Sequence, residues 1–248
     1  MTRTALITGI TSGIGEAAAR RFIADGWKVV GTGRRRERLD ALAAELGERL
    51  HAVELDLRGD ELAGFLLRLP DGFREIDLLV NNAGLASPLD TLQDAAQGPL
   101  VAVIDTNITA LVELTRLALP TLIDRKGMIV NLSSVAATYP YRGGAVYAGS
   151  KAFVHQFSLG LRCDLAGTGV RVTSIEPGMV ETEFTLVRNG GDQAASDAFY
   201  GGVEPMTGDD IANVIHWVAT LPPHLNINTL DLMPVNQSWA GFAVHRQP

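Results

Sequence analysis

Short apolar runs recur along the chain, and each is separated from the next by a segment of helical length. The runs are hydrophobic throughout rather than alternating with polar residues, a pattern typical of strands buried on both faces of a sheet. They span residues 4–8, 27–32, 50–55, 76–81, 127–132, 170–175 and 227–232. The helix-length segments span residues 14–25, 36–46, 60–69, 99–123, 146–166 and 208–220. This alternation predicts an α/β fold with a doubly wound parallel sheet, which binds ligands at the carboxyl ends of its strands.

One segment breaks the alternation. Residues 184–207 are rich in glycine, alanine and polar residues, and they separate the sixth run from the next helix. A loop of this length inside a compact domain is usually a lid or disordered, and its position after a strand end favours a lid. No linker or strict repeat divides the sequence. We therefore expect residues 1–248 to form a single domain that ends in a tail at 233–248.

The composition narrows the choice of partners. Of the 248 residues, 46% are hydrophobic and 20% are charged, and the net charge of −7 argues against a nucleic-acid partner. The single cysteine, Cys163, excludes an internal disulfide and gives no sign of a zinc cluster or another metal site. The N-terminal apolar run is too short for a signal peptide, and no stretch reaches the roughly 18 apolar residues of a membrane span. A cytoplasmic protein with no membrane partner is expected.

The segment "TGITSGIG" (8–15) joins the first predicted strand to the first helix. Gly9 permits a tight turn, Gly13 lets the backbone approach a pyrophosphate, and Gly15 lets the helix pack against the strand. Unpaired N–H groups at the start of a helix attract phosphate. The turn therefore predicts a dinucleotide site, with a purely structural glycine turn as the alternative.

A cluster of arginines follows the second predicted strand, in "GTGRRRERL". A protein that prefers NAD normally has Asp or Glu here for the adenosine ribose, and no carboxylate stands at this strand end. Cations at the start of a helix oppose its dipole, so their presence indicates an anion to bind. We assign Arg34 and Arg35 to the 2′-phosphate of NADP and expect Arg36 to be solvated, the alternative being a solvated basic helix start.

The segment "VYAGSKAFVHQF" (146–157) places Tyr147 and Lys151 one helical turn apart on the same face. The positive amine favours the phenolate, so we expect Lys151 to lower the pKa of Tyr147 and to make the phenol a general acid and base. A helix surface with one aromatic and one solvated charge is the plain alternative.

Taken together, these motifs resemble the short-chain dehydrogenase/reductase family over nearly the whole length. The resemblance rests on the glycine-rich turn, "NNAG" (81–84), Asn107, "NLSS" (131–134), "YAGSK" (147–151) and "PGMVET" (177–182). It implies a single Rossmann-type domain with a parallel sheet of seven strands and helices on both faces, commonly assembled as a homotetramer. Within the family, "GRRRERL", "YPYRGGAVY" and the tail are similar to the NADP-dependent 3-hydroxy acid dehydrogenases.

The resemblance implies a catalytic group and a set of cofactor contacts. Tyr147 is the general acid/base, Lys151 tunes it and holds the nicotinamide ribose, and Ser134 rather than its neighbour Ser133 donates to the substrate oxygen. Asn107 binds a water on a proton path, with a buried structural asparagine as the alternative. The cofactor-binding residues are Gly9, Thr11, Ser12, Gly13, Ile14, Gly15, Arg34, Arg35, Asp56, Leu57, Asn82, Ala83, Gly84, Tyr147, Lys151, Pro177, Gly178, Val180 and Thr182.

A small 3-hydroxy acid needs a cation for its carboxylate. Arg188 in the lid is our first candidate and Arg142 the second, while Tyr141 and Phe184 shape the pocket beside Ser134 and Tyr147; each arginine could equally be a solvated surface residue. The predicted function is hydride transfer between NADP(H) and a small 3-hydroxy acid or its semialdehyde. A reductase of sulfoacetaldehyde or of another small carbonyl compound is the alternative, and a non-enzymatic NADP sensor is a third hypothesis that the intact catalytic group disfavours.

Overall fold

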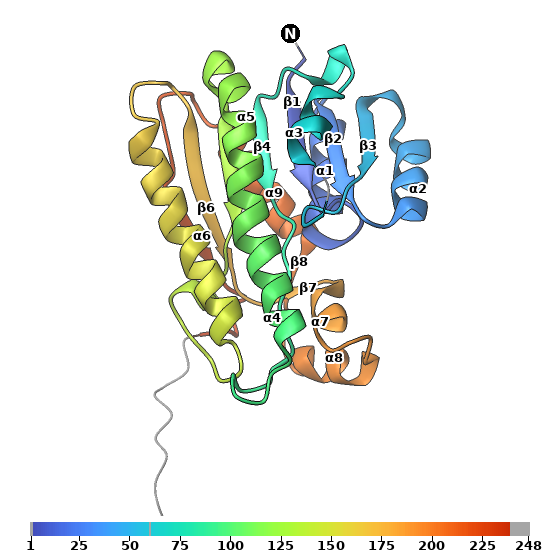
Figure 1. Ribbon diagram of the computed structural model, residues 1–248, viewed down its shortest axis with the longest axis vertical. Coiled ribbons are helices and arrows are strands. Elements are labelled where there is room, and N and C mark those ends of the chain that lie inside the picture. Colours follow the sequence, from blue (N-terminus) through green and yellow to red (C-terminus); the bar gives the residue numbers. More distant parts are fainter. Residues whose placement is uncertain (1, 60, 239–248) are drawn as a thin grey trace, which may run out of the picture.

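The computed structural model describes residues 2–59 and 61–238, and within them seven strands form one parallel sheet (Figure 1). The strand order is β3-β2-β1-β4-β5-β6-β9, and each neighbouring pair is parallel. The strands are β1 (Thr4–Thr8), β2 (Lys28–Gly33), β3 (Leu50–Glu54), β4 (Leu78–Asn81), β5 (Met128–Leu132), β6 (Arg171–Pro177) and β9 (Thr229–Leu232). The winding reverses between β1 and β4, which opens a crevice at the carboxyl ends of these strands. The predicted fold class and all seven strands are confirmed.

Helices cover both faces of the sheet because successive strand residues point to opposite sides. Ile7 belongs to a core with helices α1 (Gly13–Ala24), α2 (Arg36–Leu46) and α9 (Gly208–Thr220). Its neighbour Leu6 belongs to a second core with helices α3 (Leu62–Leu67), α5 (Leu111–Arg125) and α6 (Ala145–Asp164). No helix among the described residues is long and apolar enough to cross a membrane.

The predicted helix at 99–123 is interrupted. Helix α4 (Gln97–Ile104), with Pro99 in its first turn, leads into a π-helical segment, Asp105–Ala110, before α5 begins. Such wider turns in a helix often mark functional sites. The widened turn contains Asn107, which is 1% exposed.

The segment predicted as a loop-like lid is largely helical. It forms α7 (Glu183–Arg188) and α8 (Gln193–Tyr200), and it is flanked by the short paired strands β7 (Val180–Glu181) and β8 (Met206–Thr207). N-cap side chains stabilise the start of each helix. The Thr182 hydroxyl and an Asp192 carboxylate oxygen accept hydrogen bonds from backbone N–H groups of the first turns. Both helices lie beyond the carboxyl ends of the strands (Figure 1). The predicted tail lies outside the described residues from 239 onward.

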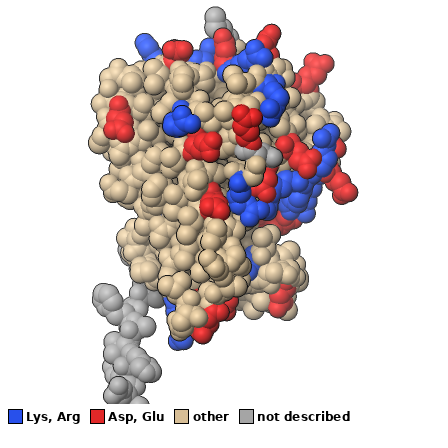
Figure 2. Space-filling view, viewed as in Figure 1, with Lys and Arg blue, Asp and Glu red and all other residues tan. Residues whose placement is uncertain are grey.

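Charged side chains are unevenly distributed over the surface. Acidic and basic residues crowd the side that carries α2 and β3, whereas the side over α5 and α6 carries few (Figure 2). Apolar side chains are exposed on that second side and on the adjoining α4: Val101, Ile104, Ile123 and Phe153.

Candidate active site

A single large cavity of about 1190 Å³ lies at the carboxyl ends of the strands. It is bounded by the glycine-rich turn after β1, the loops after β2 to β6, and the lid helix α7. Its volume is at the upper end for small-molecule sites, so it can hold a ligand as large as a dinucleotide together with a substrate.

The glycine-rich turn has the backbone that the sequence predicts. Gly9 and Gly13 have φ values of 76° and 57°, in the left-handed region that favours glycine. A Cβ atom on Gly15 would lie 2.3 Å from the Gly9 carbonyl oxygen, so only glycine fits where α1 packs under the turn. Ser12, the residue before α1, makes no side-chain cap bond, and the first helical residues, Gly13 and Ile14, line the cavity. These residues fit a bound pyrophosphate.

The predicted cofactor residues converge on this cavity. All of them line it except Gly15, which is buried beneath the turn. Sequence reasoning missed Gln237, whose side-chain oxygen accepts a 2.7 Å bond from the Met179 backbone and which also lines the cavity. Its position far along the tail gives no local signal for this contact.

The three consecutive arginines after β2, Arg34 to Arg36, lie in different surroundings. Arg34 is exposed and lines the cavity near Asp56, whereas Arg36 is exposed and bonded to Asp40, as a solvated residue is expected to be. Arg35 folds over the glycine-rich turn, where its guanidinium donates to both oxygens of Thr11 at 2.9–3.1 Å and to the Ser12 hydroxyl at 2.7 Å.

Two further residues complete this basic cluster and were not predicted. Arg38 donates to the Thr11 carbonyl oxygen at 3.0 Å. The Glu183 carboxylate accepts from Arg35 at 2.6 Å and from Arg38 at 2.7 Å. The bonds from Arg38 and then Arg35 lower the pKa of Glu183 to about 2 against a smaller effect of burial. The spacing of Arg34 and Arg38 at i and i+4 could have indicated Arg38, but no local pattern links it to Glu183.

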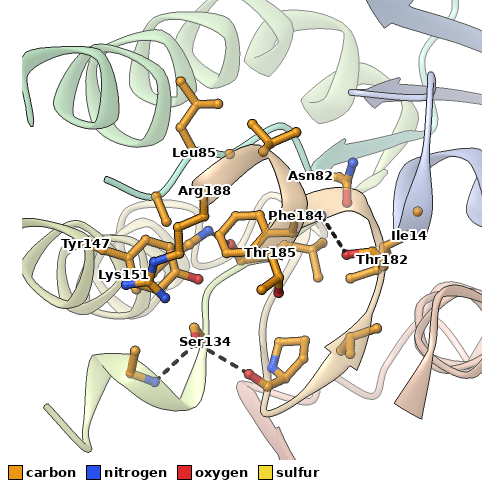
Figure 3. Close-up of a pocket in the computed structure, with 18 of the residues that line it drawn as sticks. Ile14, Asn82, Leu85, Ser134, Tyr147, Lys151, Thr182, Phe184, Thr185 and Arg188 are labelled. Atoms are coloured by element: carbon orange, nitrogen blue, oxygen red, sulfur yellow. Dashed lines mark hydrogen bonds between the residues drawn. The ribbon is translucent and has the colours of Figure 1, made fainter. Parts of the chain in front are cut away.

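The catalytic candidates also meet in the cavity (Figure 3). Tyr147 and Lys151 are both buried on α6, with the Lys151 Nζ atom 5.8 Å from the centre of the tyrosine ring. The Ser134 hydroxyl, just after β5, lowers the pKa of the Tyr147 phenol, and it accepts a 3.1 Å bond from the Ala136 backbone. Ser133 instead donates to the Lys151 carbonyl oxygen at 2.7 Å and so holds α6 to the sheet. The preference for Ser134 over Ser133 agrees with this geometry.

The expected acidification of Tyr147 by Lys151 is wrong for the chain by itself. Burial raises the pKa of Tyr147 to about 12, against smaller lowering effects of the Ser134 bond and the Arg188 charge. Burial also lowers the pKa of Lys151 to about 8, and its amine donates to the Leu132 carbonyl oxygen at 2.7 Å. Removal from water disfavours the charged form of both groups. The helical spacing of the two residues in the sequence does not show how deeply they are buried, so this effect could not be predicted from it.

Asn107 lies behind the cavity wall rather than on it. Its side-chain oxygen accepts from the Leu85 backbone at 2.8 Å, and its amide donates to the Leu85 carbonyl oxygen and to Ser150. A Cβ atom on Gly84 would lie 3.4 Å from both the Asn107 oxygen and the Lys151 amine. Asn107 therefore fixes the loop after β4 next to Lys151.

Three of the predicted substrate-pocket residues, Tyr141, Phe184 and Arg188, come together around Tyr147. The Arg188 guanidinium lies 5.9 Å from the centre of the Tyr147 ring, and it donates to the Tyr141 hydroxyl at 2.9 Å. The Phe184 ring lies 5.7 Å from the Tyr147 ring. Arg142 lines the cavity but is exposed. Arg188 thus places a guanidinium beside the phenol ring, in addition to the Lys151 amine.

A parallel doubly wound sheet with a dinucleotide-shaped cavity, a buried Tyr–Lys pair and an adjacent serine defines a class of nucleotide-dependent oxidoreductases. The comparisons agree: the family model described as "short chain dehydrogenase" matches residues 3–191, and the chain belongs to that family. It is an enzyme of the dehydrogenase type, as predicted.

The chain is also similar to individual members of this family. The chain is 64% identical to serine 3-dehydrogenase of Rhizobium radiobacter, with 100% of each chain covered. It is 53% identical to sulfoacetaldehyde reductase 2 of Chromohalobacter salexigens, with 99% of this chain and 100% of that one covered. Among solved structures, the closed form of serine dehydrogenase complexed with NADP+ matches with a TM-score of 0.96 at 48% identity, over 98% of this chain and 100% of that chain.

Proposed function

We propose that the protein is an NADP-dependent dehydrogenase that transfers a hydride between NADP(H) and a small 3-hydroxy acid, of the serine type, or its semialdehyde. The observation that carries the substrate class is Arg188, a guanidinium 5.9 Å from the centre of the Tyr147 ring. A 3-hydroxy acid has its acid group a few bonds from the carbon that is oxidised, so a cation beside the proton-transferring phenol suits it. The serine 3-dehydrogenase relative supports this class.

The cofactor end of the cavity fits NADP. Gly9, Gly13 and the start of α1 would hold the pyrophosphate, and Arg34 and Arg35 the 2′-phosphate. Asp56 and Leu57 would contact the adenine, Val180 the nicotinamide carboxamide through its backbone, and Thr182 the pyrophosphate. When bound, the oxidised cofactor supplies the hydride acceptor and a positively charged ring.

The residues around the phenol would move the proton. Tyr147 would exchange a proton with the oxygen on C3, and Ser134, which lines the same cavity, would stabilise charge on that oxygen. Lys151 would bind the ribose hydroxyls. Asn107 would act through the loop after β4, which it holds against Lys151. Burial raises the pKa of Tyr147 to about 12, so in the chain alone the phenol carries the proton that the direction of reduction requires.

The sulfoacetaldehyde reductase relative supports a second candidate, because a guanidinium binds a sulfonate as well as a carboxylate. A panel of serine, 3-hydroxyisobutyrate, 3-hydroxypropionate and isethionate, followed by NADPH absorbance, distinguishes the two. We expect turnover of at least one carboxylic acid with a kcat/KM above that of isethionate. Preference for isethionate would replace the carboxylate assignment, and NADPH binding without any turnover would favour a sensor.

Three further expectations complete the proposal. Residues 1–248 form one NADP-binding domain with a substrate lid over 184–207, and the protein works in the cytoplasm as a homotetramer. The charge-poor side over α5 and α6, with Ile123 and Phe153 exposed, supports assembly (Figure 2). Light scattering of the purified protein tests the subunit number.

A further inference from the structure

Glu183 joins the two ends of the cavity. It is the first residue of lid helix α7, and its carboxylate accepts from Arg35 at 2.6 Å and from Arg38 at 2.7 Å. Those two arginines are in turn bonded to the glycine-rich turn through Thr11. The glycine-rich turn, the start of α2 and the lid helix are therefore tied together through one carboxylate.

Helix α7 depends on such ties because it is short. It spans six residues, Glu183–Arg188, and a helix of that length does not persist in water without tertiary contacts. Its other ties are the Thr182 cap bond, the hydroxyl pair of Thr185 and Tyr200 at 2.7 Å, and the bonds from Arg188 to the Ser87 carbonyl oxygen at 3.1 Å and to the Tyr141 hydroxyl at 2.9 Å. The bonds of Glu183 differ from these ties in two ways. They are ion pairs, and they connect the helix to the cofactor end of the cavity.

The same helix carries the residues that face the phenol. Phe184 follows Glu183 directly, and Arg188 closes the helix, and both lie within 6 Å of the Tyr147 ring centre. Arg188 and Phe184 both lie beside Tyr147 (Figure 3), so we expect a shift of the N-terminus of α7 to move the predicted substrate-binding guanidinium.

We propose that Glu183 is a positioning residue, which clasps α7 to Arg35 and Arg38 and so sets the place of Arg188 in the substrate pocket. The inference rests on the proposed function, since it takes Arg188 as the partner of the substrate's acid group. Glu183 itself touches neither Tyr147 nor Lys151 in any described contact. It acts through the helix that it begins.

The electrostatics support a clasp that is always charged. The pKa of Glu183 is lowered to about 2, first by the bond from Arg38, so its carboxylate is ionised at every pH at which the enzyme is assayed. The three side chains are between 35% and 46% exposed, so each ion pair alone is weak. Two guanidinium groups on one carboxylate form a network, which is where partly exposed pairs contribute measurably.

The kinetic test replaces Glu183 by Gln, with Glu181→Gln as the matched control. Glu181 is an exposed acid two residues earlier on β7, so its variant makes the same charge change outside the clasp. For the best acid of the substrate panel, we expect Glu183→Gln to raise KM by about three- to tenfold and to change kcat by less than about twofold. A KM equal to that of Glu181→Gln, or a fall in kcat with KM unchanged, would overturn the proposal.

A second measurement reads the clasp without turnover. Amide hydrogen exchange over residues 183–189, with no ligand added, should be faster in Glu183→Gln than in the wild type and unchanged in Glu181→Gln. Equal exchange in all three proteins would overturn the clasp. If the wild type oxidises no hydroxy acid, the proposed function fails while this exchange measurement still decides the clasp.

A double-variant cycle tests whether the pair acts as a unit. Arg38→Met should also raise exchange over 183–189, and the double variant with Glu183→Gln should add little beyond the larger single effect. Fully additive effects would mean that the two residues act independently, which contradicts the proposal.

Discussion

The cofactor end and the substrate end of the cavity are built in different ways. At the cofactor end, consecutive residues of one turn set the shape through their backbone, with Gly9 and Gly13 at positive φ and Gly15 in close contact with the turn. At the substrate end, side chains from distant segments meet, with Arg188 bonded to Tyr141 and to the Ser87 carbonyl oxygen. The cofactor end is therefore encoded by one contiguous motif, whereas the substrate end forms only when folding brings distant segments together.

The Tyr147 phenol lies between the two ends of the cavity, and its removal should have the largest effect on activity. Tyr147→Phe removes the proton donor and keeps the buried ring, so kcat should fall by about 10²–10⁴-fold. NADPH binding, followed by the fluorescence of the bound cofactor, should change little. Turnover near the wild-type rate would show that the proton comes from another group.

Disturbing the backbone of the cofactor end should give the next largest effect. Gly15→Ala puts a Cβ atom 2.3 Å from the Gly9 carbonyl oxygen, so we expect a loss of stability of about 1–3 kcal/mol and markedly weaker NADPH binding. Thermal unfolding and the same fluorescence titration measure both.

Gly160→Ala is the matched control for that substitution. Gly160 lies in α6, where a Cβ atom would meet nothing within 4 Å, so alanine should stabilise the helix by about 0.5–1 kcal/mol. Equal behaviour of the two variants would contradict the close packing of the turn.

The arginines at the cofactor end should discriminate between cofactors. Arg34→Ala combined with Arg35→Ala should raise the KM for NADP by about 10- to 100-fold and leave the use of NAD little changed. Arg36→Ala serves as the control, because Arg36 is exposed and paired with Asp40. An equal loss with both cofactors would remove the assignment of the 2′-phosphate.

The buried Tyr147–Lys151 pair predicts a pH dependence of stability. The pKa of Lys151 is lowered from 10.5 to about 8, so between these values the unfolded chain binds more protons and stability should rise with pH. The pKa of Tyr147 is raised from 10.0 to about 12, so its contribution should fall with pH over that range. Each slope is at most about 1.4 kcal/mol per pH unit.

Two variants separate these contributions. The difference in unfolding free energy between wild type and Lys151→Met should rise from about pH 8, and the difference for Tyr147→Phe should fall above about pH 10. Flat differences would mean that the two groups titrate in the fold as they do in water.

The strands and the glycine-rich turn could be predicted because each depends on local pattern. Buried parallel strands are apolar runs, and Gly9, Gly13 and Gly15 have spacing that follows from backbone geometry. Family resemblance supplied Ser134 and Asn107, which no local rule selects.

What escaped prediction depends on contacts between distant segments. Glu183 meets Arg38 across 145 positions of sequence, and Gln237 meets Met179 from the tail. The pKa directions of Tyr147 and Lys151 follow from burial, which the folded chain determines and helical spacing does not. The N-cap residues of α7 and α8 are also hard to recognise in the sequence, because the segment contains many other polar residues.

The central claim is that Arg188 selects an acid group beside the phenol. The most direct measurement compares kcat/KM for 3-hydroxypropionate and its neutral methyl ester with NADP+, in the wild type and in Arg188→Ala. We predict that the wild type prefers the acid by about tenfold or more and that Arg188→Ala loses this preference. A wild type indifferent to the charge, or a preference that survives in Arg188→Ala, would contradict the account.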